Sequence, residues 1–296
     1  MRLESVLAAH AERFPCKTAI ICDGVRVSYG ALQRLIGETA NGLFECGLRR
    51  GDKIVIYLPN GLELVQLIYA AYTLGAVAVP VTTRLTIGEV GGFCRDCNAK
   101  MLAFHEDQGA GLGDLLAERS GMKAIVVGGD SPGATPFGEL PRQGLVMLPS
   151  VPYDHDECMI NYTSGTTGRS KGAMLTQANL LSNAQTLADL WRFTKADVLL
   201  HALPIFHTHG LFVATNVTLV AGGAMIFMPK LDIDRLIDRM PHATAMMGVP
   251  TFYTRLLDDA IFTRETTANM RLFISGSAPL LAETHVDFEE RTGHRI

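Results

Sequence analysis

The chain has 296 residues, of which 48% are hydrophobic and 19% are charged, enough for one large or two ordinary globular domains. The net charge of −4 and the pI near 6.1 argue against the basic surface that nucleic acid requires. No apolar run reaches the roughly 18 residues of a membrane span. Glu4, His10 and Glu12 interrupt the first apolar segment, so we expect no signal peptide and a cytoplasmic protein.

The first third of the chain alternates between helical and strand patterns. Residues 1–17 read as an amphipathic helix, and strands at Ala19–Cys22 and Val25–Ser28 flank an Asp-Gly turn. A helix with apolar residues on one face follows and ends at Gly47. A buried strand within 51–60, an apolar helix over 61–76 and a strand at 77–83 complete the rhythm, which predicts a parallel sheet covered by helices.

The stretch from Asp107 to Asp154 is rich in glycine and proline, and we interpret it as surface loops around one strand at Ala124–Val127. The six cysteines are scattered. Cys94 and Cys97 form a lone C-x-x-C without a second ligand pair or a thioredoxin-like context, so we expect ordinary reduced thiols.

The second half resumes the alternation after this loop-rich stretch. A helix from Ala178 to Trp191 is expected to begin at an N-cap, Thr176. The predicted strands are Met159–Tyr162, Ala173–Leu175, Asp197–Ala202, Ala224–Met228, Ala245–Gly248 and Leu272–Ser275. We therefore predict an α/β fold of two sheet-and-helix subdomains, at residues 1–150 and 151–296.

One loop stands out for its chemistry. The stretch "YTSGTTGRSKGAML", from Tyr162 to Leu175, places glycines, hydroxyls and Lys171 between two apolar strands. It does not fit a P-loop, because Ser170 and Gly172 stand where the second Gly and the Ser/Thr should be, and a strand follows it. Its backbone N–H groups, hydroxyls and ammonium group still suit phosphate. The alternative interpretation is a polar hairpin loop.

This stretch resembles the phosphate-loop signature of the adenylate-forming superfamily, which contains acyl-CoA synthetases, luciferases and adenylation domains. "ALPIFHTHGL" resembles the superfamily's histidine motif, "GVPTFYTRLL" its acyl-pocket segment and "LFISGSAPL" its adenine-binding segment. The opening segment "VSYGALQRLIGETANGLFECGLRRGDKIVIYLPN" also follows its pattern. From residue 156 onward the chain is most similar to malonyl-CoA synthetases. The resemblance implies most of the large N-terminal domain of such an enzyme.

The resemblance also implies two-step chemistry, in which ATP converts a carboxylate to an acyl-adenylate and coenzyme A then displaces AMP. ATP would contact Thr163, Ser164, Gly165, Thr166, Thr167, Gly168, Lys171, Gly276, Ser277, Ala278 and Pro279. His207 and Lys171 are the candidate catalytic residues, and His207 would also contact the acid; no role is assigned to His209. Arg255 and, more weakly, Arg271 are candidates for the second carboxylate of malonate, because a buried carboxylate needs a cation. Arg255 could instead face solvent or pair with Asp258 or Asp259.

The chain departs from the superfamily at its end, "TGHRI". The superfamily's Tyr-Gly-x-Thr-Glu motif, which supplies a Mg²⁺ ligand, and the C-terminal domain with a catalytic lysine would follow. We therefore expect a truncated ligase with negligible activity as an isolated chain and no protein ligand for Mg²⁺. One alternative is a non-catalytic nucleotide-binding or interaction module. Another is a ligase for a different short- or medium-chain acid.

Overall fold

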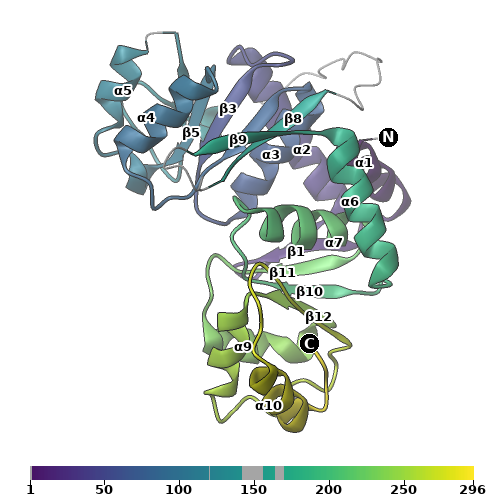
Figure 1. The fold of residues 1–296 in the computed structure, drawn as a ribbon. Coiled ribbons are helices and arrows are strands. Elements are labelled where there is room, and N and C mark those ends of the chain that lie inside the picture. Colours follow the sequence, from purple (N-terminus) through teal and green to yellow (C-terminus); the bar gives the residue numbers. More distant parts are fainter. Residues whose placement is uncertain (1, 120, 142–155, 164–169) are drawn as a thin grey trace. The chain divides into compact units, whose positions relative to one another are not determined.

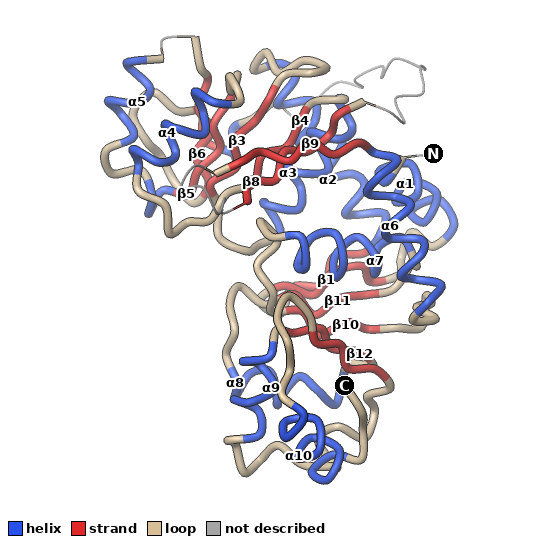
Figure 2. The backbone as a smooth tube through the Cα atoms, in the orientation of Figure 1, coloured by secondary structure: helices blue, strands red, loops and turns tan. Residues whose placement is uncertain are grey.

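The computed structural model describes residues 2–119, 121–141, 156–163 and 170–296. The chain forms two compact units, one made of Met1–Pro15 and Gly30–Leu181 and the other of Cys16–Tyr29 and Ser182–Ile296. Each unit contains one β-sheet with helices packed against it, as Figures 1 and 2 show. The predicted α/β class with two sheet-and-helix subdomains is confirmed.

The sheet of the first unit has the strand order β7-β6-β5-β3-β4-β8-β9 and is parallel except for the antiparallel pair β8–β9. Its strands are β3 (Lys53–Tyr57), β4 (Val77–Pro80), β5 (Met101–His105), β6 (Lys123–Val127), β7 (Thr135–Pro136), β8 (Glu157–Thr163) and β9 (Lys171–Thr176). The helices of this part are α1 (Leu3–Arg13), α2 (Tyr29–Glu45), α3 (Leu62–Leu74), α4 (Ile87–Asp96) and α5 (Leu112–Glu118).

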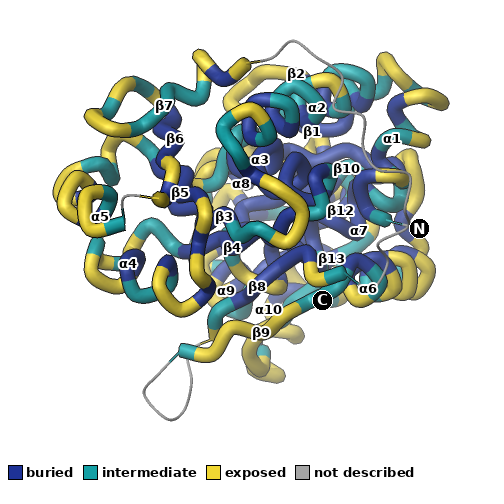
Figure 3. Tube along the Cα trace, turned by 90° about the horizontal axis from the view of Figure 1, so that it is seen from above, coloured by how far each residue is buried: buried dark blue, intermediate teal, exposed yellow. Residues whose placement is uncertain are grey.

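Burial explains why the central strands of this sheet are continuous apolar runs. All four residues of β4 are buried, as are Ile54–Tyr57 of β3, because helices cover both faces of a parallel sheet. Figure 3 shows the central strands as largely buried. α3 is buried on almost every side, which accounts for its nearly unbroken apolar sequence.

The region after residue 107 differs from the sequence-based expectation of loops around one strand. The predicted strand is present as β6, but a helix, α5, precedes it. Leu112 and Leu115 of α5 are buried, and the Leu115 side chain packs against Gly91 of α4. Because α5 is short and has only two buried positions, its sequence shows little of the periodicity that predicts a helix. Tertiary packing, which local sequence does not reveal, stabilises this helix.

The sheet of the second unit has the order β13-β12-β10-β11-β1-β2 and is parallel except for the hairpin β1–β2. Its strands are β1 (Thr18–Cys22), β2 (Val25–Ser28), β10 (Val198–His201), β11 (Ala224–Phe227), β12 (Ala245–Gly248) and β13 (Leu272–Ser275). The helices after the first unit's sheet are α6 (Gln177–Leu190), α7 (Asn216–Val220), α8 (Ile233–Arg239), α9 (Pro250–Leu257) and α10 (Ala282–Thr292). Thr176 caps α6 as predicted, since its Oγ1 accepts a hydrogen bond from the N–H of Asn179 at 3.2 Å.

The direction of the chain through this sheet sets the faces on which its helices lie. After β10, the chain places β11 on one side of β10 in the sheet, and it then crosses back over β10 to place β12 and β13 on the other side. Because such crossovers are right-handed, α7 lies on one face and α8 and α9 on the other. Figure 1 shows α7 on the opposite side of these strands from α9 and α10.

The two units do not follow sequence order. The hairpin β1–β2 pairs with β11, with Ile20 opposite Met225, and so joins the second unit. β8 and β9, which flank the predicted phosphate loop, extend the sheet of the first unit through the pairing of Ala78 with Met159. The expected division at residues 150 and 151 falls outside the described residues and stays a prediction.

Candidate functional site

Three of the segments singled out by sequence leave the carboxyl ends of three neighbouring strands in the second unit. β10 ends at His201 and leads into the histidine segment, β12 ends at Gly248 and leads into α9, and β13 ends at Ser275 and leads into residues 276–279. These strands are parallel and adjacent in the order β13-β12-β10. Their carboxyl ends therefore share one edge, where open α/β sheets bind their ligands.

Direct contacts join these segments at that edge. The N–H of Gly276 donates to the carbonyl of Gly248 at 3.1 Å. The hydroxyl of Ser277 lies 3.2 Å from Nδ1 of His209, and a Cβ on Gly276 would lie 3.0 Å from the imidazole of His209. Gly276 therefore allows the loop after β13 to approach the ring closely. Ser277 has a φ of 69°, a left-handed conformation that is uncommon for a residue with a side chain.

Sequence analysis assigned a role only to His207, but His209 is the histidine that the structure brings into contact with the loop after β13. Its ring connects the histidine segment to the Gly276–Ser277 loop, whereas His207 is exposed and its ring lies 4.2 Å from that of Phe206, tilted by 48°. Partial removal of water from around the two rings lowers the pKa of both imidazoles from the usual 6.5, which favours their neutral forms at pH 7. A neutral imidazole can donate one hydrogen bond and accept another, which suits a carboxylate or phosphate partner.

A buried histidine shapes the backbone that carries His209. The Nδ1 atom of His201 accepts a hydrogen bond from the N–H of Leu203 at 3.2 Å, so the ring proton is on Nε2. That nitrogen lies 3.1 Å from the carbonyl of Gly210 and 3.0 Å from Oγ1 of Thr215. Burial lowers the pKa of His201 to about 3. The neutral ring thus holds both ends of a π-helix, His209–Thr215, a feature common at functional sites.

The two arginine candidates occupy different environments. Arg255 lies on the exposed side of α9, which agrees with the alternative of a solvent-facing arginine. It forms no hydrogen bond or ion pair with another described residue, so the alternative pairing with Asp258 or Asp259 is absent there. Arg271 precedes β13, at the amino end of the strands. Its Nε and Nη2 atoms lie 2.6 and 2.9 Å from the two carboxylate oxygens of buried Asp197. We therefore leave Arg271 out of the candidate site.

The predicted phosphate loop belongs to the first unit. Thr163 ends β8 and Lys171 begins β9, and the two residues pair across the strands. Lys171 is exposed at the base of the loop. Tyr162 anchors this base by donating to Asp96 at 2.7 Å. Ser164, Gly165, Thr166, Thr167 and Gly168 lie outside the described residues, and their predicted contacts with ATP stay predictions.

Comparison with known proteins identifies the family. The family model for AMP-binding enzymes matches residues 7–296. The chain belongs to the AMP-binding enzyme family. This membership confirms the resemblance to the adenylate-forming superfamily that the loop and the three other motifs indicate.

Individual relatives of this AMP-binding chain agree with the assignment. The structure of apo MatB from Rhodopseudomonas palustris superimposes with a TM-score of 0.90 at 42% sequence identity, covering 100% of this chain and 59% of that one. A malonate–CoA ligase of Arabidopsis thaliana is 28% identical over 95% of this chain and 52% of its own length. A feruloyl-CoA synthase of an Amycolatopsis species is 29% identical over 92% of this chain and 54% of its own length. The chain therefore spans about half the length of the curated relatives it matches.

Other features of this family member concern metals, thiols and membranes. Within the described ranges, no cluster of three or more His, Cys, Asp or Glu side chains could hold a metal ion. Burial raises the pKa of Cys94 to about 12 and that of Cys97 to about 11, so both thiols stay protonated at pH 7. No helix in the described part of the chain is long and apolar enough to cross a membrane.

Proposed function

We propose that this chain carries the adenylating half-site of an ATP-dependent carboxylate–CoA ligase, with malonate as the acid. The observation that carries the proposal is the meeting of the histidine segment, α9 and the Gly276–Pro279 loop at one edge of the second sheet. Family membership supports the ligase class. The Arabidopsis malonate–CoA ligase supports malonate, although other relatives are named for ferulate, sulfoacetate and long-chain fatty acids.

The proposed reaction has two displacement steps. An oxygen of the acid attacks the α-phosphorus of ATP, the bond to pyrophosphate breaks, and an acyl-adenylate forms. The sulfur of coenzyme A then attacks the acyl carbon, and AMP leaves as the thioester forms. Both steps develop negative charge on oxygen atoms, so the protein acts mainly by positioning groups and stabilising charge.

The residues would divide this work between them. Thr163 and Lys171, with residues 164–168 between them, would hold the β- and γ-phosphates, and the Lys171 ammonium would neutralise part of their charge. His207 would donate to the acid carboxylate near the α-phosphate, while Gly276–Pro279 would line the adenine. Mg²⁺ would enter with ATP and supply further positive charge beside the phosphates.

Arg255 remains the candidate that would select malonate. A dicarboxylate keeps one charge after adenylation, and a guanidinium group can hold it through two parallel hydrogen bonds. Arg255 suits this role because α9 starts at the carboxyl end of β12 and no described residue neutralises its charge. The proposed location is the cytoplasm. The unpaired state of all six cysteines is compatible with its reducing conditions.

The test is a hybrid enzyme in which residues 1–296 are joined to the remaining C-terminal part of Rhodopseudomonas palustris MatB. Acid-dependent release of AMP and pyrophosphate would be measured with malonate, butyrate, ferulate and sulfoacetate. We expect malonate to give the highest kcat/KM. Acid-independent turnover, or equal rates with all four acids, would contradict the proposal for malonate, and no turnover by a folded, ATP-binding hybrid would contradict ligase function.

A charge variant tests the phosphate assignment in the same hybrid. Lys171→Ala should lower kcat/KM for ATP at least about tenfold, because one charge-assisted contact to the phosphates is lost. Lys100→Ala is the matched control, since Lys100 is also an exposed lysine of the first unit. If both variants stay within about twofold of the parent hybrid, Lys171 is a solvated loop residue.

A further inference from the structure

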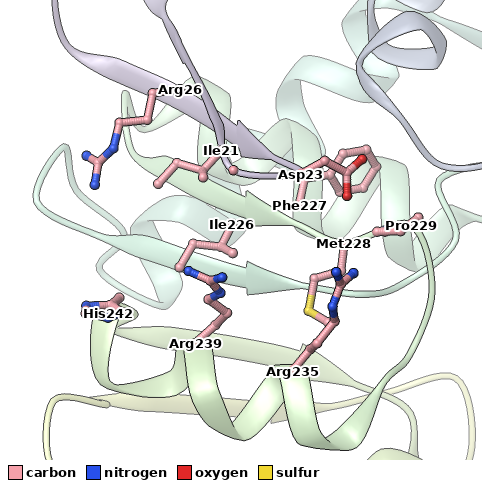
Figure 4. A pocket seen from close by; sticks show the side chains of 11 residues that line it. Ile21, Asp23, Arg26, Ile226, Phe227, Met228, Pro229, Arg235, Arg239 and His242 are labelled. Carbon is pink, nitrogen blue, oxygen red and sulfur yellow. The ribbon is translucent and has the colours of Figure 1, made fainter.

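A second candidate site lies in the second unit, away from the three motif segments. It is a cavity of about 390 Å³ between the hairpin β1–β2, the end of β11 and the helix α8. Figure 4 shows the side chains around it. None of its lining residues belongs to the histidine segment, to α9 or to the Gly276–Pro279 loop. Its volume falls within the range of small-molecule sites.

The walls of this cavity carry an excess of positive charge. Arg26 comes from β2 and Arg235 and Arg239 from α8, while Asp23 is the one acidic residue among the described residues that line the cavity. Three guanidinium groups and one carboxylate leave a net charge of +2. The wall arginines thus come from two elements that are distant in sequence, and the tertiary fold brings their charges to one cavity.

These charges are largely uncompensated by the described residues. Arg26 and Arg235 form no ion pair with another described side chain. Among the side chains that the structure describes, Arg239 forms an ion pair only with its neighbour Asp238, at 3.4 Å, and both side chains of that pair are more than half exposed. An exposed pair of this kind contributes little and exchanges readily for a stronger anionic partner.

The floor of the cavity has the opposite character. Ile21 of β1 and Ile226 and Phe227 of β11 line it together with Met228 and Pro229, which follow β11. In Figure 4 the two isoleucines lie between the arginines of the hairpin and of α8. The cavity thus combines an apolar surface with guanidinium groups, so a matching ligand has an apolar body and an anionic group.

We propose that this cavity binds a phosphate monoester with an aromatic or aliphatic body. A phosphate monoester carries a charge of about −1.5 to −2 at pH 7, which matches the net charge of the walls. A carboxylate carries only one charge and would leave the cavity positive. The planar fork of an arginine side chain fits phosphate oxygens through paired hydrogen bonds, and two or more arginines can engage one group together.

The experiment is isothermal titration of the 296-residue chain with phenyl phosphate at low ionic strength, and with benzoate for comparison. We expect one phenyl phosphate per chain with a Kd on the order of 1 mM or below, and binding at least about fivefold weaker for benzoate. Arg26→Gln and Arg239→Gln should each weaken phenyl phosphate binding about threefold, and the double variant about tenfold. These residues are exposed, and thermal unfolding without ligand would verify that the variants fold.

Two controls make the outcome unambiguous. Arg34→Gln removes an exposed arginine of α2 in the first unit and should leave binding within twofold. Lys171→Ala reports binding at the predicted phosphate loop instead. Equal affinity for phenyl phosphate and benzoate, a double variant that binds like the parent, or a loss seen only with Lys171→Ala would each overturn the proposal.

Discussion

Replacing Arg271 by leucine should destabilise the second unit without touching the candidate site. The guanidinium group forms two hydrogen bonds with Asp197, at 2.6 and 2.9 Å, and donates to the carbonyls of Trp191 and Arg192. Removing one partner of a fully buried pair costs about 3–5 kcal/mol. The Asp197 side chain is 5% exposed but that of Arg271 is 38% exposed, so the cost is reduced.

Asp197 also keeps other donors in the variant. The hydroxyl of Thr244 and the N–H of Thr194 both reach its carboxylate at 2.8 Å. We therefore expect a loss of about 2–3 kcal/mol, or a decrease in Tm of about 6–10 °C for a unit of this size. Calorimetry at pH 7 would measure it. Arg295→Leu is the matched control, because it breaks the exposed pair with Glu289 and should not shift Tm measurably.

The pH dependence gives a second readout of the same pair. Burial pushes the pKa of Asp197 upward, but hydrogen bonds from Arg271, Thr194 and Thr244 outweigh it and hold the pKa below 3.8. The folded protein thus binds this proton less readily than the unfolded chain does. The stabilisation that ionised Asp197 contributes is complete above about pH 4 and is lost as the pH falls through the lower pKa that Asp197 has in the folded protein.

The difference in stability between the parent and Arg271→Leu should accordingly narrow below pH 4. An unchanged Tm at pH 7 would refute this reasoning. Loss of malonate use by the hybrid enzyme with no change in Tm would instead return Arg271 to the list of acid-binding residues.

Three further substitutions test individual parts of the site. Gly210→Ala should lower the free energy of unfolding, measured in urea, by about 3 kcal/mol, because the added Cβ would lie 2.2 Å from the carbonyl oxygen of Pro204. Gly88→Ala is the control and should be neutral or stabilising, since, apart from the adjoining residues and backbone of its own helix, no described atom lies within 4 Å of the added Cβ. The free energy of unfolding should fall as the pH drops from 6.5 toward 3, because His201 takes up a proton in the unfolded chain but not when it is buried in the folded protein. His201→Asn should reduce the slope of unfolding free energy against pH by about 1.4 kcal/mol per pH unit. An unchanged slope would contradict a neutral, buried His201. Arg255→Leu in the hybrid should lower kcat/KM for malonate at least about 100-fold while sparing butyrate, and parallel losses on both acids would mean a structural role.

Local sequence determined most of the individual elements. The strands Ala245–Gly248 and Leu272–Ser275 occur as predicted, because short apolar runs between turn residues leave few alternatives. The Asp-Gly turn after Cys22 and the N-cap at Thr176 also follow from side-chain chemistry that acts within a few residues. The motif order identified the family, since a long pattern of specific residues is not expected by chance.

Tertiary structure decided which residues meet. No local pattern distinguishes Arg271 as the partner of Asp197, because 74 residues separate them and only the adjacency of β10, β12 and β13 brings them together. His209 gains its contact with Ser277 for the same reason. α5 depends on packing against α4. The cavity between the hairpin β1–β2, the end of β11 and α8 exists because this hairpin, from the start of the chain, pairs with the sheet of the second unit. These features rest on long-range strand pairing, which the periodicity of a single segment does not encode.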